Sequence, residues 1–375
     1  MSEPGKIPSE RLRDANSEVA TSFRQLRAAI DKAGPLDYAT REYLMLAAFA
    51  AAGYEESFRI HARRAVERGL SKAAMQQAVL VPFGATTAML PVVRALEWID
   101  DAFVQHRPEI HSVSSRDGTA IGYTRSGAGP ALVLVHGATS ERSRWRPVLG
   151  ALASRYTVYA LDRRGRGASK DAADYAIERE FADVAALVDS ISGPVAVIAH
   201  SYGAICALEA TRLTPNIKRL VLYEPPIATQ AMSAEDAAAL EATIEEIERQ
   251  LAREDRAGAL ETFYTRNLRM PEAELAAVRS LPNWPARLAL AHTLPRGLRE
   301  TRRYRFDAGR FRNYAVPTLL VLGGDSVPRY HESTALLHRS LTGAKLAVLA
   351  GQKHTAIDAA PELFAATALD FLARN

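Results

Sequence analysis

A serine at the end of an apolar run is the first residue of this 375-residue chain whose setting points to chemistry. Residues 195–203 read V-A-V-I-A-H-S-Y-G, and a helix-favouring run, A-I-C-A-L-E-A, follows. The apolar residues are typical of a strand buried on both faces of a parallel sheet. Small residues at 199 and 203 allow a sharp turn around Ser201, although alanine stands at 199 where glycine is usual. The pattern predicts a nucleophile elbow, with the serine hydroxyl raised above a helix N-terminus that favours negative charge.

Two later residues, each following an apolar run, are candidates for the base and the acid that this serine needs. His354 comes after the predicted strand 345–349, and Asp325 comes after the predicted strand 318–322. A serine hydroxyl needs a base to take its proton, and a carboxylate fixes the tautomer of that base. We therefore predict a triad of Ser201, His354 and Asp325. Glu224, in L-Y-E-P-P, also ends a strand and is the alternative acid; Asp325 is preferred because it follows the strand just before the histidine's.

Two further turns lie where an acyl-transfer site needs them. After the apolar run 131–135 comes His136-Gly137-Ala138-Thr139, and after 157–161 comes the glycine-rich D-R-R-G-R-G-A-S. The backbone N–H groups of Ala138 and Tyr202 are predicted to form an oxyanion hole. All these residues follow strands, and ligands bind at the carboxyl ends of parallel strands.

The elements that position these residues alternate from residue 111 onward. Asp117-Gly118 predicts a hairpin, and short β-branched strands then alternate with helical patterns, which indicates a mostly parallel sheet with helices on both faces. About ninety residues separate Pro226 from Pro317, too many for one crossover helix, so we expect a helical cap at about 227–316. The predicted hydrolytic domain therefore spans 111–375.

The composition of residues 1–106 predicts a separate all-α domain. Alanine, leucine, glutamate and arginine dominate, and glycine and proline occur mainly at the breaks. The expected helices lie near 9–32, 37–52, 55–68, 72–81 and 86–103. Residues 107–120 lose the helical periodicity and mark the boundary.

Residues 111–375 resemble the α/β-hydrolase superfamily. The resemblance rests on H-G, D-x-R-G-x-G-x-S, A-H-S-Y-G, G-G-D and the final histidine, and on the chain order serine, acid, histidine. It implies a serine hydrolase that forms an acyl-enzyme. Serine at the nucleophile position argues against the branches that need an aspartate nucleophile, the dehalogenases and epoxide hydrolases.

Residues 37–103 resemble the carboxymuconolactone decarboxylase family, which includes AhpD-like peroxidases. The resemblance rests on L-D-Y-A-T-R-E-Y-L-M-L-A-A-F-A-A-A-G, R-I-H-A-R-R-A-V-E-R-G-L-S and a phenylalanine-glycine. Tyr54 and Ser57 occupy the cysteine positions of the peroxidase members, which excludes disulfide redox chemistry here. Glu42 and His61 are retained and form a possible second site. The resemblance also implies association through helical faces, so homo-oligomerisation is the expected role of this domain.

The leading hypothesis is a hydrolase of a carboxylic ester or lactone with an oligomerising helical domain. The first alternative is a bifunctional carboxymuconolactone decarboxylase and enol-lactonase of aromatic degradation. The second is a non-enzymatic ligand-binding protein on a hydrolase scaffold, against which the complete triad speaks. Perhydrolases, acyltransferases and carbon–carbon hydrolases use the same triad and stay open.

Composition bounds these hypotheses. The net charge is +4 and the chain has one cysteine, Cys206, so neither an intramolecular disulfide nor a cysteine metal cluster can form. We expect a cytoplasmic protein with no cofactor, metal or membrane span, and no nucleic-acid partner because no reader motif accompanies the basic residues. Seven arginines crowd 294–312. We expect at least one of them to point into the pocket and to favour an acidic substrate.

Overall fold

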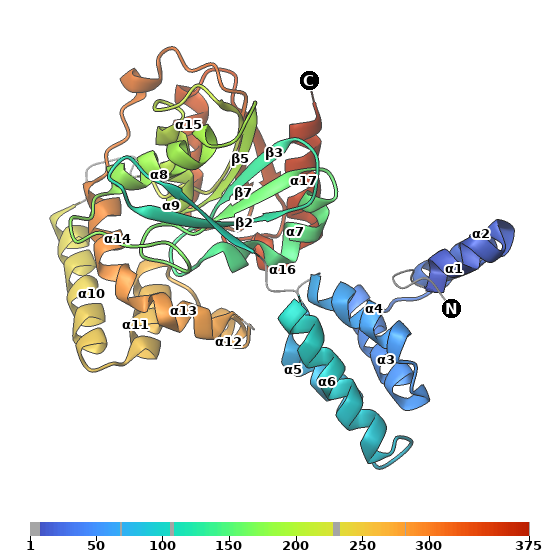
Figure 1. Cartoon of the computed structure of the whole chain (residues 1–375). Coiled ribbons are helices and arrows are strands. Elements are labelled where there is room, and N and C mark those ends of the chain that lie inside the picture. Colours follow the sequence, from blue (N-terminus) through green and yellow to red (C-terminus); the bar gives the residue numbers. More distant parts are fainter. Residues whose placement is uncertain (1–7, 68–69, 106–108, 228–232, 282, 375) are drawn as a thin grey trace. The chain divides into compact units, whose positions relative to one another are not determined.

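The computed structural model describes residues 8–67, 70–105, 109–227, 233–281 and 283–374, and Figure 1 shows them. The chain divides into two compact units, one up to residue 107 and one from residue 108. Each unit is described by itself below. No described helix is long and apolar enough to cross a membrane.

The N-terminal unit is helical. Helices α3 to α6 pack around a core that includes Leu46, Phe58, Met75 and Ile99. The expected helix at 9–32 is two helices, because the side chain of Asn16 accepts hydrogen bonds from the N–H groups of residues 18 and 19 and begins a new helix. The helices are α1 (Pro8–Ala15), α2 (Ser17–Lys32), α3 (Tyr38–Ala52), α4 (Glu55–Glu67), α5 (Lys72–Leu80) and α6 (Met89–Gln105).

The second unit contains an eight-stranded sheet in the order β1-β2-β4-β3-β5-β6-β7-β8. Strands β1 and β2 form an antiparallel hairpin, β2 also pairs antiparallel with β4, and the remaining neighbours are parallel. The strands are β1 (Ile110–Ser114), β2 (Ala120–Ser126), β3 (Ala131–Val135), β4 (Thr157–Leu161), β5 (Val195–His200), β6 (Ile217–Tyr223), β7 (Thr318–Gly323) and β8 (Lys345–Leu349).

Helices cover both faces of the sheet (Figure 1). Along β3, Val133 and Val135 pack into one core, and Leu132 and Leu134 pack into the other, as the two-residue period of a strand requires. One face carries α8 (Ile177–Asp189), α9 (Tyr202–Ala210) and α15 (Pro328–Ser340); the other carries α7 (Arg146–Ala153), α16 (Ala356–Ala359) and α17 (Pro361–Ala373). The predicted fold class is confirmed.

A helical cap lies between β6 and β7, where the sequence predicts it. It has its own core, which includes Ile244, Leu260, Phe263 and Leu294. A π-helical turn, Phe263–Asn267, follows the second cap helix, and its side chains Phe263 and Tyr264 line a cavity that also contains Ser201. The cap helices are α10 (Ala234–Ala252), α11 (Arg256–Thr262), α12 (Glu272–Arg279), α13 (Trp284–Leu290) and α14 (Leu294–Arg303).

Candidate active site

Ser201 stands at a strained turn between β5 and α9. Its φ is 55° and its ψ is −126°, a conformation that a residue with a side chain adopts only under constraint. The turn is crowded: a Cβ at Gly203 would lie 2.3 Å from the carbonyl oxygen of His136, and one at Gly137 would lie 2.9 Å from the Ser201 Cβ. Glycine is therefore required at both positions. This is the geometry of the predicted nucleophile elbow.

The carboxylate that contacts His354 is that of Glu224. Its Oε2 lies 2.6 Å from His354 Nδ1. The side chain is fully buried at the end of β6, and its Oε1 accepts hydrogen bonds from the Gly323 N–H at 2.7 Å and the Ser326 hydroxyl at 2.5 Å. The imidazole and these two donors fix the carboxylate in one orientation. Glu224 is therefore placed to hold the proton of His354 on Nδ1 and leave Nε2 free as a base.

The prediction of Asp325 as the orienting acid is wrong in this geometry. Asp325 is exposed in the turn after β7 and lines the pocket, and its backbone N–H donates to the Gln352 carbonyl oxygen at 2.9 Å. In this turn, the Gly323 N–H donates to the Glu224 carboxylate, and Glu224 is the acid that contacts His354. Glu224, the alternative in L-Y-E-P-P, takes the position instead, because its side chain reaches His354 and is held there by the Gly323 N–H and the Ser326 hydroxyl.

Aromatic rings fix the plane of His354. Tyr330 stacks on it with ring centroids 4.3 Å apart and an angle of 8° between the planes, and His200 packs against it at 4.6 Å. His200 Nε2 lies 3.1 Å from the His354 carbonyl oxygen, so this nitrogen carries a proton and donates it. Burial and the nearby His354 lower the pKa of His200 well below its usual value. His200 is therefore a neutral positioning residue, a role that the sequence did not indicate.

The two residues predicted to supply oxyanion donors, Ala138 and Tyr202, line the same cavity as Ser201. Tyr202 begins α9, so its N–H is among the first-turn donors that have no partner within a helix. His136 braces the loop before Ala138: its Nε2 accepts from the Arg163 N–H at 3.0 Å, so its Nδ1 carries the proton and donates to the Gly137 carbonyl oxygen at 2.8 Å.

A buried ion pair lies beneath this loop. Arg163, in the glycine-rich turn after β4, forms a two-pronged pair with Glu180 of α8 at 2.6 and 2.8 Å. Its guanidinium also donates to the Gly137 carbonyl oxygen and stacks 3.9 Å from the ring of Tyr202. It thus contacts both predicted oxyanion segments. The D-x-R-G signal placed this turn near the site, but its ion-pair partner on a helix could not be found from the sequence.

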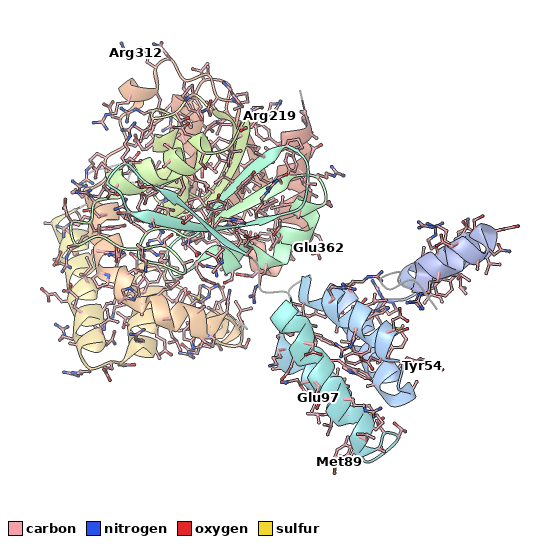
Figure 2. All side chains as sticks on the ribbon, in the orientation of Figure 1. Tyr54, Met89, Glu97, Arg219, Arg312 and Glu362 are labelled. Carbon is pink, nitrogen blue, oxygen red and sulfur yellow. The ribbon has the colours of Figure 1, made fainter. Side chains whose placement is uncertain are left out.

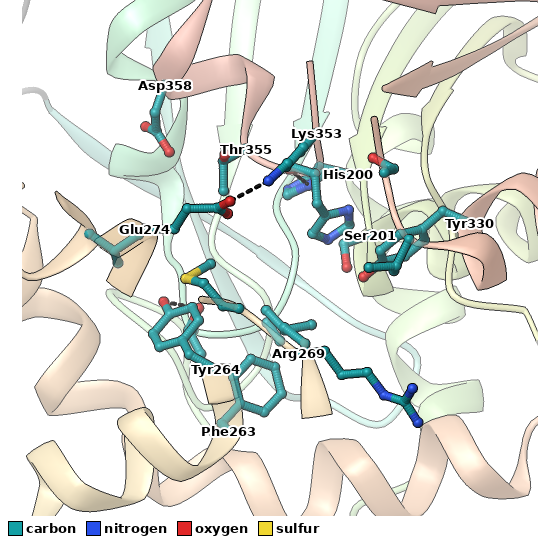
Figure 3. A pocket seen from close by; sticks show the side chains of 18 of the residues that line it. His200, Ser201, Phe263, Tyr264, Arg269, Glu274, Tyr330, Lys353, Thr355 and Asp358 are labelled. Atoms are coloured by element: carbon teal, nitrogen blue, oxygen red, sulfur yellow. Dashed lines mark hydrogen bonds and ion pairs between the residues drawn. The ribbon is translucent and has the colours of Figure 1, made fainter. Parts of the chain in front are cut away.

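Ser201 lies where two cavities meet. The smaller, of about 260 Å³, is lined by His200, His354 and Asp325 and by the cap aromatics Phe263 and Tyr264. Figure 3 shows these aromatic side chains opposite Ser201, with Glu274 and Lys353 paired beside them. The larger, of about 510 Å³, extends from Ser201 and Tyr202 under α10 and α14 of the cap. Ser201 thus lines two distinct cavities.

The seven arginines of residues 294–312 make different contacts. Arg302 and Arg305 line the larger cavity, but Arg302 pairs with Glu241, and Arg305 is exposed and donates to the Tyr304 carbonyl oxygen. That one of the seven points inward and binds an acidic substrate stays a prediction. Four others face acidic side chains elsewhere, and Arg312 is exposed. The four are Arg296 with Asp171, Arg299 with Glu248, Arg303 with Glu178 and Glu300, and Arg310 with Asp307.

The second predicted pair lies in the N-terminal unit. Glu42 of α3 and His61 of α4 are joined by a 2.8 Å contact between Oε2 and Nδ1, and Phe49 packs against the imidazole with centroids 5.1 Å apart. Both side chains are more than four-fifths buried. The geometry brings together two groups that could exchange a proton. Among the described residues, no cluster of three or more His, Cys, Asp or Glu side chains is arranged to hold a metal ion.

Comparison with known proteins gives the relationship of each unit. Residues 132–367 match the model of the alpha/beta hydrolase family, and residues 17–100 match that of the carboxymuconolactone decarboxylase family. Among solved structures, an α/β hydrolase from Sphaerobacter thermophilus is 34% identical, with a TM-score of 0.60, and the match covers 70% of this chain and all of that one. Both resemblances drawn from the sequence are confirmed.

Two curated relatives match shorter stretches. The 2-(acetamidomethylene)succinate hydrolase of Mesorhizobium japonicum is 28% identical over 148 residues, which are 38% of this chain and 51% of that protein. The N-formylmaleamate deformylase of Pseudomonas putida is 35% identical over 119 residues, which are 30% of this chain and 44% of that protein. The chain thus spans about half the length of these relatives.

Proposed function

Because the chain belongs to the alpha/beta hydrolase family, we propose that it is a serine hydrolase that cleaves a carboxylic ester or lactone through an acyl-enzyme. The observation that carries the proposal is the 2.6 Å contact between the buried Glu224 and His354, which lines a pocket together with Ser201 at its strained turn. Such a pair gives a serine hydroxyl the base that it needs.

The proposed reaction gives each of these groups a role. His354 Nε2 takes the proton of Ser201 as Oγ attacks the carbonyl carbon, and the N–H groups of Ala138 and Tyr202 stabilise the oxyanion. His354 then returns the proton to the leaving alkoxide as the carbon–oxygen bond breaks. A water molecule, deprotonated by the same nitrogen, attacks the acyl-enzyme; the bond between the acyl carbon and Ser201 Oγ then breaks, Oγ takes the proton back from His354, and the acid is released. Glu224 stays ionised and stabilises the imidazolium in both steps.

The first test is labelling with a fluorophosphonate, which phosphonylates an activated serine. We expect wild type to lose ester hydrolysis as label appears on Ser201, and S201A to take no label and to lose on the order of 10⁶-fold in rate. Circular dichroism of S201A should match wild type. Hydrolysis by S201A within tenfold of wild type would overturn the proposal, as would a wild type that turns over neither esters, lactones nor amides.

Amides belong in the panel because the curated relatives are a hydrolase of an acetamido compound and a deformylase.

We further propose that the N-terminal unit acts chiefly in homo-oligomerisation. A second function, proton transfer in a decarboxylation, is favoured only by the Glu42–His61 contact. The two are separated by E42Q: loss of carboxymuconolactone decarboxylation with ester hydrolysis unchanged would support a bifunctional enzyme. No decarboxylation by wild type would rule it out.

A further inference from the structure

The wall of the larger cavity contains a buried arginine that makes no hydrogen bond to a carboxylate of the described residues. Arg166 lies in the glycine-rich turn after β4, is 3% exposed and lines the cavity together with Ser201 and Tyr202. Its NH1 donates to the Arg164 carbonyl oxygen at 3.1 Å, and its Nε has no hydrogen-bond partner among the described residues. The closest carboxylate oxygen recorded for it, on Glu180, is 3.8 Å away.

The charges around Arg166 do not balance. Glu180 already accepts two hydrogen bonds from Arg163 and one from the Tyr175 hydroxyl. Two buried guanidinium groups thus share one carboxylate. Burial and the charge of Arg163 lower the pKa of Arg166 below its ordinary value, which agrees with an excess of positive charge at this position. A buried charge without a paired partner is costly, and an anion in the cavity would supply that partner.

The rest of the cavity wall adds positive charge. Arg302, Arg305 and Arg329 line it, and the Nε of Arg329 is likewise buried without a hydrogen-bond partner. Arg302 is paired with Glu241 at 2.8 Å, so it is partly neutralised. The acidic residues of the lining are Asp236, which accepts from the Ser233 hydroxyl, and Glu332. The cationic side chains of this wall outnumber the acidic ones.

The two cavities receive different parts of a substrate. His354 lines only the smaller one, and a leaving group must lie beside the base that protonates it. Tyr202, an oxyanion donor, lines only the larger one. The leaving group therefore belongs in the smaller cavity, and the acyl chain belongs in the larger one, toward Arg166.

We propose that the substrate carries a free carboxylate on its acyl chain, in addition to the ester or lactone that is cleaved, and that Arg166 binds this carboxylate in the larger cavity. The substrate class is thus the half-esters, or lactones with a carboxylated acyl chain, derived from dicarboxylic acids. This inference rests on the proposed hydrolase function and specifies its substrate.

The smaller cavity also contains buried arginines, but they have partners. Arg144 lies 2.5 Å from Asp358, and Arg287 donates to the Tyr264 hydroxyl at 2.7 Å and to Asn283. Lys353 of the same cavity is paired with Glu274, and Arg269 is exposed to solvent, which weakens its attraction for an anion. An anionic leaving group is therefore less favoured than an anionic acyl chain. The experiment includes it as an outcome.

Two matched pairs of esters test whether the enzyme prefers a carboxylate on the acyl chain or on the leaving group. Monoethyl succinate and ethyl 4-oxopentanoate differ in a carboxylate or a methyl ketone on the acyl chain. Acetoxyacetate and acetoxyacetone differ in the same way on the leaving group. Wild type should show a kcat/KM about tenfold or more higher for monoethyl succinate than for its ketone, as expected for a charge-assisted contact, and no such preference within the second pair.

The variant R166M should reduce this acyl-side ratio to about threefold or less, mainly through a higher KM for monoethyl succinate. R166K should retain part of the ratio, because it keeps the charge but not the planar fork. The matched control is R310M, an exposed arginine paired with Asp307, which should keep both rates and the ratio of wild type.

A measurement on wild type covers the case in which R166M does not fold. Succinate should slow fluorophosphonate labelling of Ser201, and succinamide at equal concentration should not. The inference is overturned if wild type hydrolyses both acyl-side esters equally, if R166M with a wild-type circular dichroism spectrum lowers both equally, if only the leaving-group carboxylate is preferred, or if succinate gives no protection. Each of these outcomes leaves the hydrolase proposal intact, because that proposal is tested separately by the turnover of neutral esters, by labelling of Ser201 and by S201A.

Discussion

At the scale of single residues, the choice between two carboxylates is decided by burial and by the donors around each. Glu224 is fully buried and contacts an imidazole, an N–H and a hydroxyl, whereas Asp325 is exposed. In a site that excludes water, a carboxylate stabilises an imidazolium more strongly than one that faces solvent. Glu224 is therefore the better electrostatic partner for His354 as well as the closer one.

The variant E224Q should reduce kcat by about 10³- to 10⁴-fold, because the amide removes the charge and no longer selects the tautomer with a free Nε2. D325N should stay within about fivefold of wild type. Initial rates on a neutral acetate ester measure both, with thermal melting as the check on folding. A larger loss in D325N than in E224Q would return the acid role to the aspartate.

From the sequence, Ser201 and His354 could be proposed directly as nucleophile and base, whereas Glu224 was only the second choice for the acid. Ser201 and His354 have local signals, a strand–turn–helix with small flanks and a histidine after the last strand. The acid has no such signal, since both carboxylates follow strands whose ends meet at one edge of the sheet. Which of them reaches the imidazole depends on side-chain length and on the turn, and Glu224 has a φ of 46° that no sequence pattern shows.

At the scale of elements, charge contacts tie the β1–β2 turn to the helix that covers the sheet. Asp117 Oδ2 accepts from Arg164 at 2.9 Å and from Arg179 of α8 at 3.0 Å, and Arg164 also pairs with Asp183 of α8. The hydrogen bond from Arg164 holds the pKa of Asp117 well below its usual value. The folded state thus binds this proton more weakly than the unfolded state.

The sign of the pH effect follows from that difference. A depressed folded-state pKa stabilises the fold above the unfolded value of about 4, and the stabilisation is lost as pH falls toward the folded value. D117N should be less stable than wild type by about 1 kcal/mol at pH 6 to 7, and this gap should narrow between pH 5 and pH 3. Urea unfolding at each pH measures it.

The matched control is D174N, because Asp174 contacts the same Arg179 but is 84% exposed. Its unfolding free energy should follow that of wild type within about 0.5 kcal/mol at every pH. A gap for D117N that stays constant or widens on acidification would show that the contact does not act through its charge.

The elements were largely predictable because their signals are local. Short β-branched runs gave the parallel strands, and the long interval after Glu224 gave the cap. The break at Asn16 was missed because the helical composition continues through it, and only the side-chain cap reveals it. The π-helical turn at Phe263–Asn267 was also missed, since no composition distinguishes it from an α-helix.

At the scale of the whole molecule, exposed apolar side chains concentrate in the N-terminal unit. Val19, Phe23, Leu26 and Ile30 lie three or four residues apart on α2 and are each about half exposed. Tyr54 and Met89, labelled in Figure 2, are even more exposed. A continuous apolar stripe on a helix is unusual on the surface of a monomer and typical of an interface. The stripe on α2 is therefore the surface on which we base the proposed oligomer.

The protein should be a dimer or larger at micromolar concentration, and the double variant F23E/L26E should shift it toward monomer, because charges in the stripe would be buried without partners. The control is L363E, which places the same charge at an exposed leucine of α17 in the other unit. Light scattering coupled to size exclusion measures the mass, and ester hydrolysis by F23E/L26E should stay within about twofold of wild type, since the catalytic groups lie in the second unit. A wild-type monomer contradicts the proposal outright. An oligomer that resists F23E/L26E but dissociates with L363E would move the interface to the hydrolase unit, and the N-terminal unit would then need another role, for which the Glu42–His61 pair is the remaining candidate.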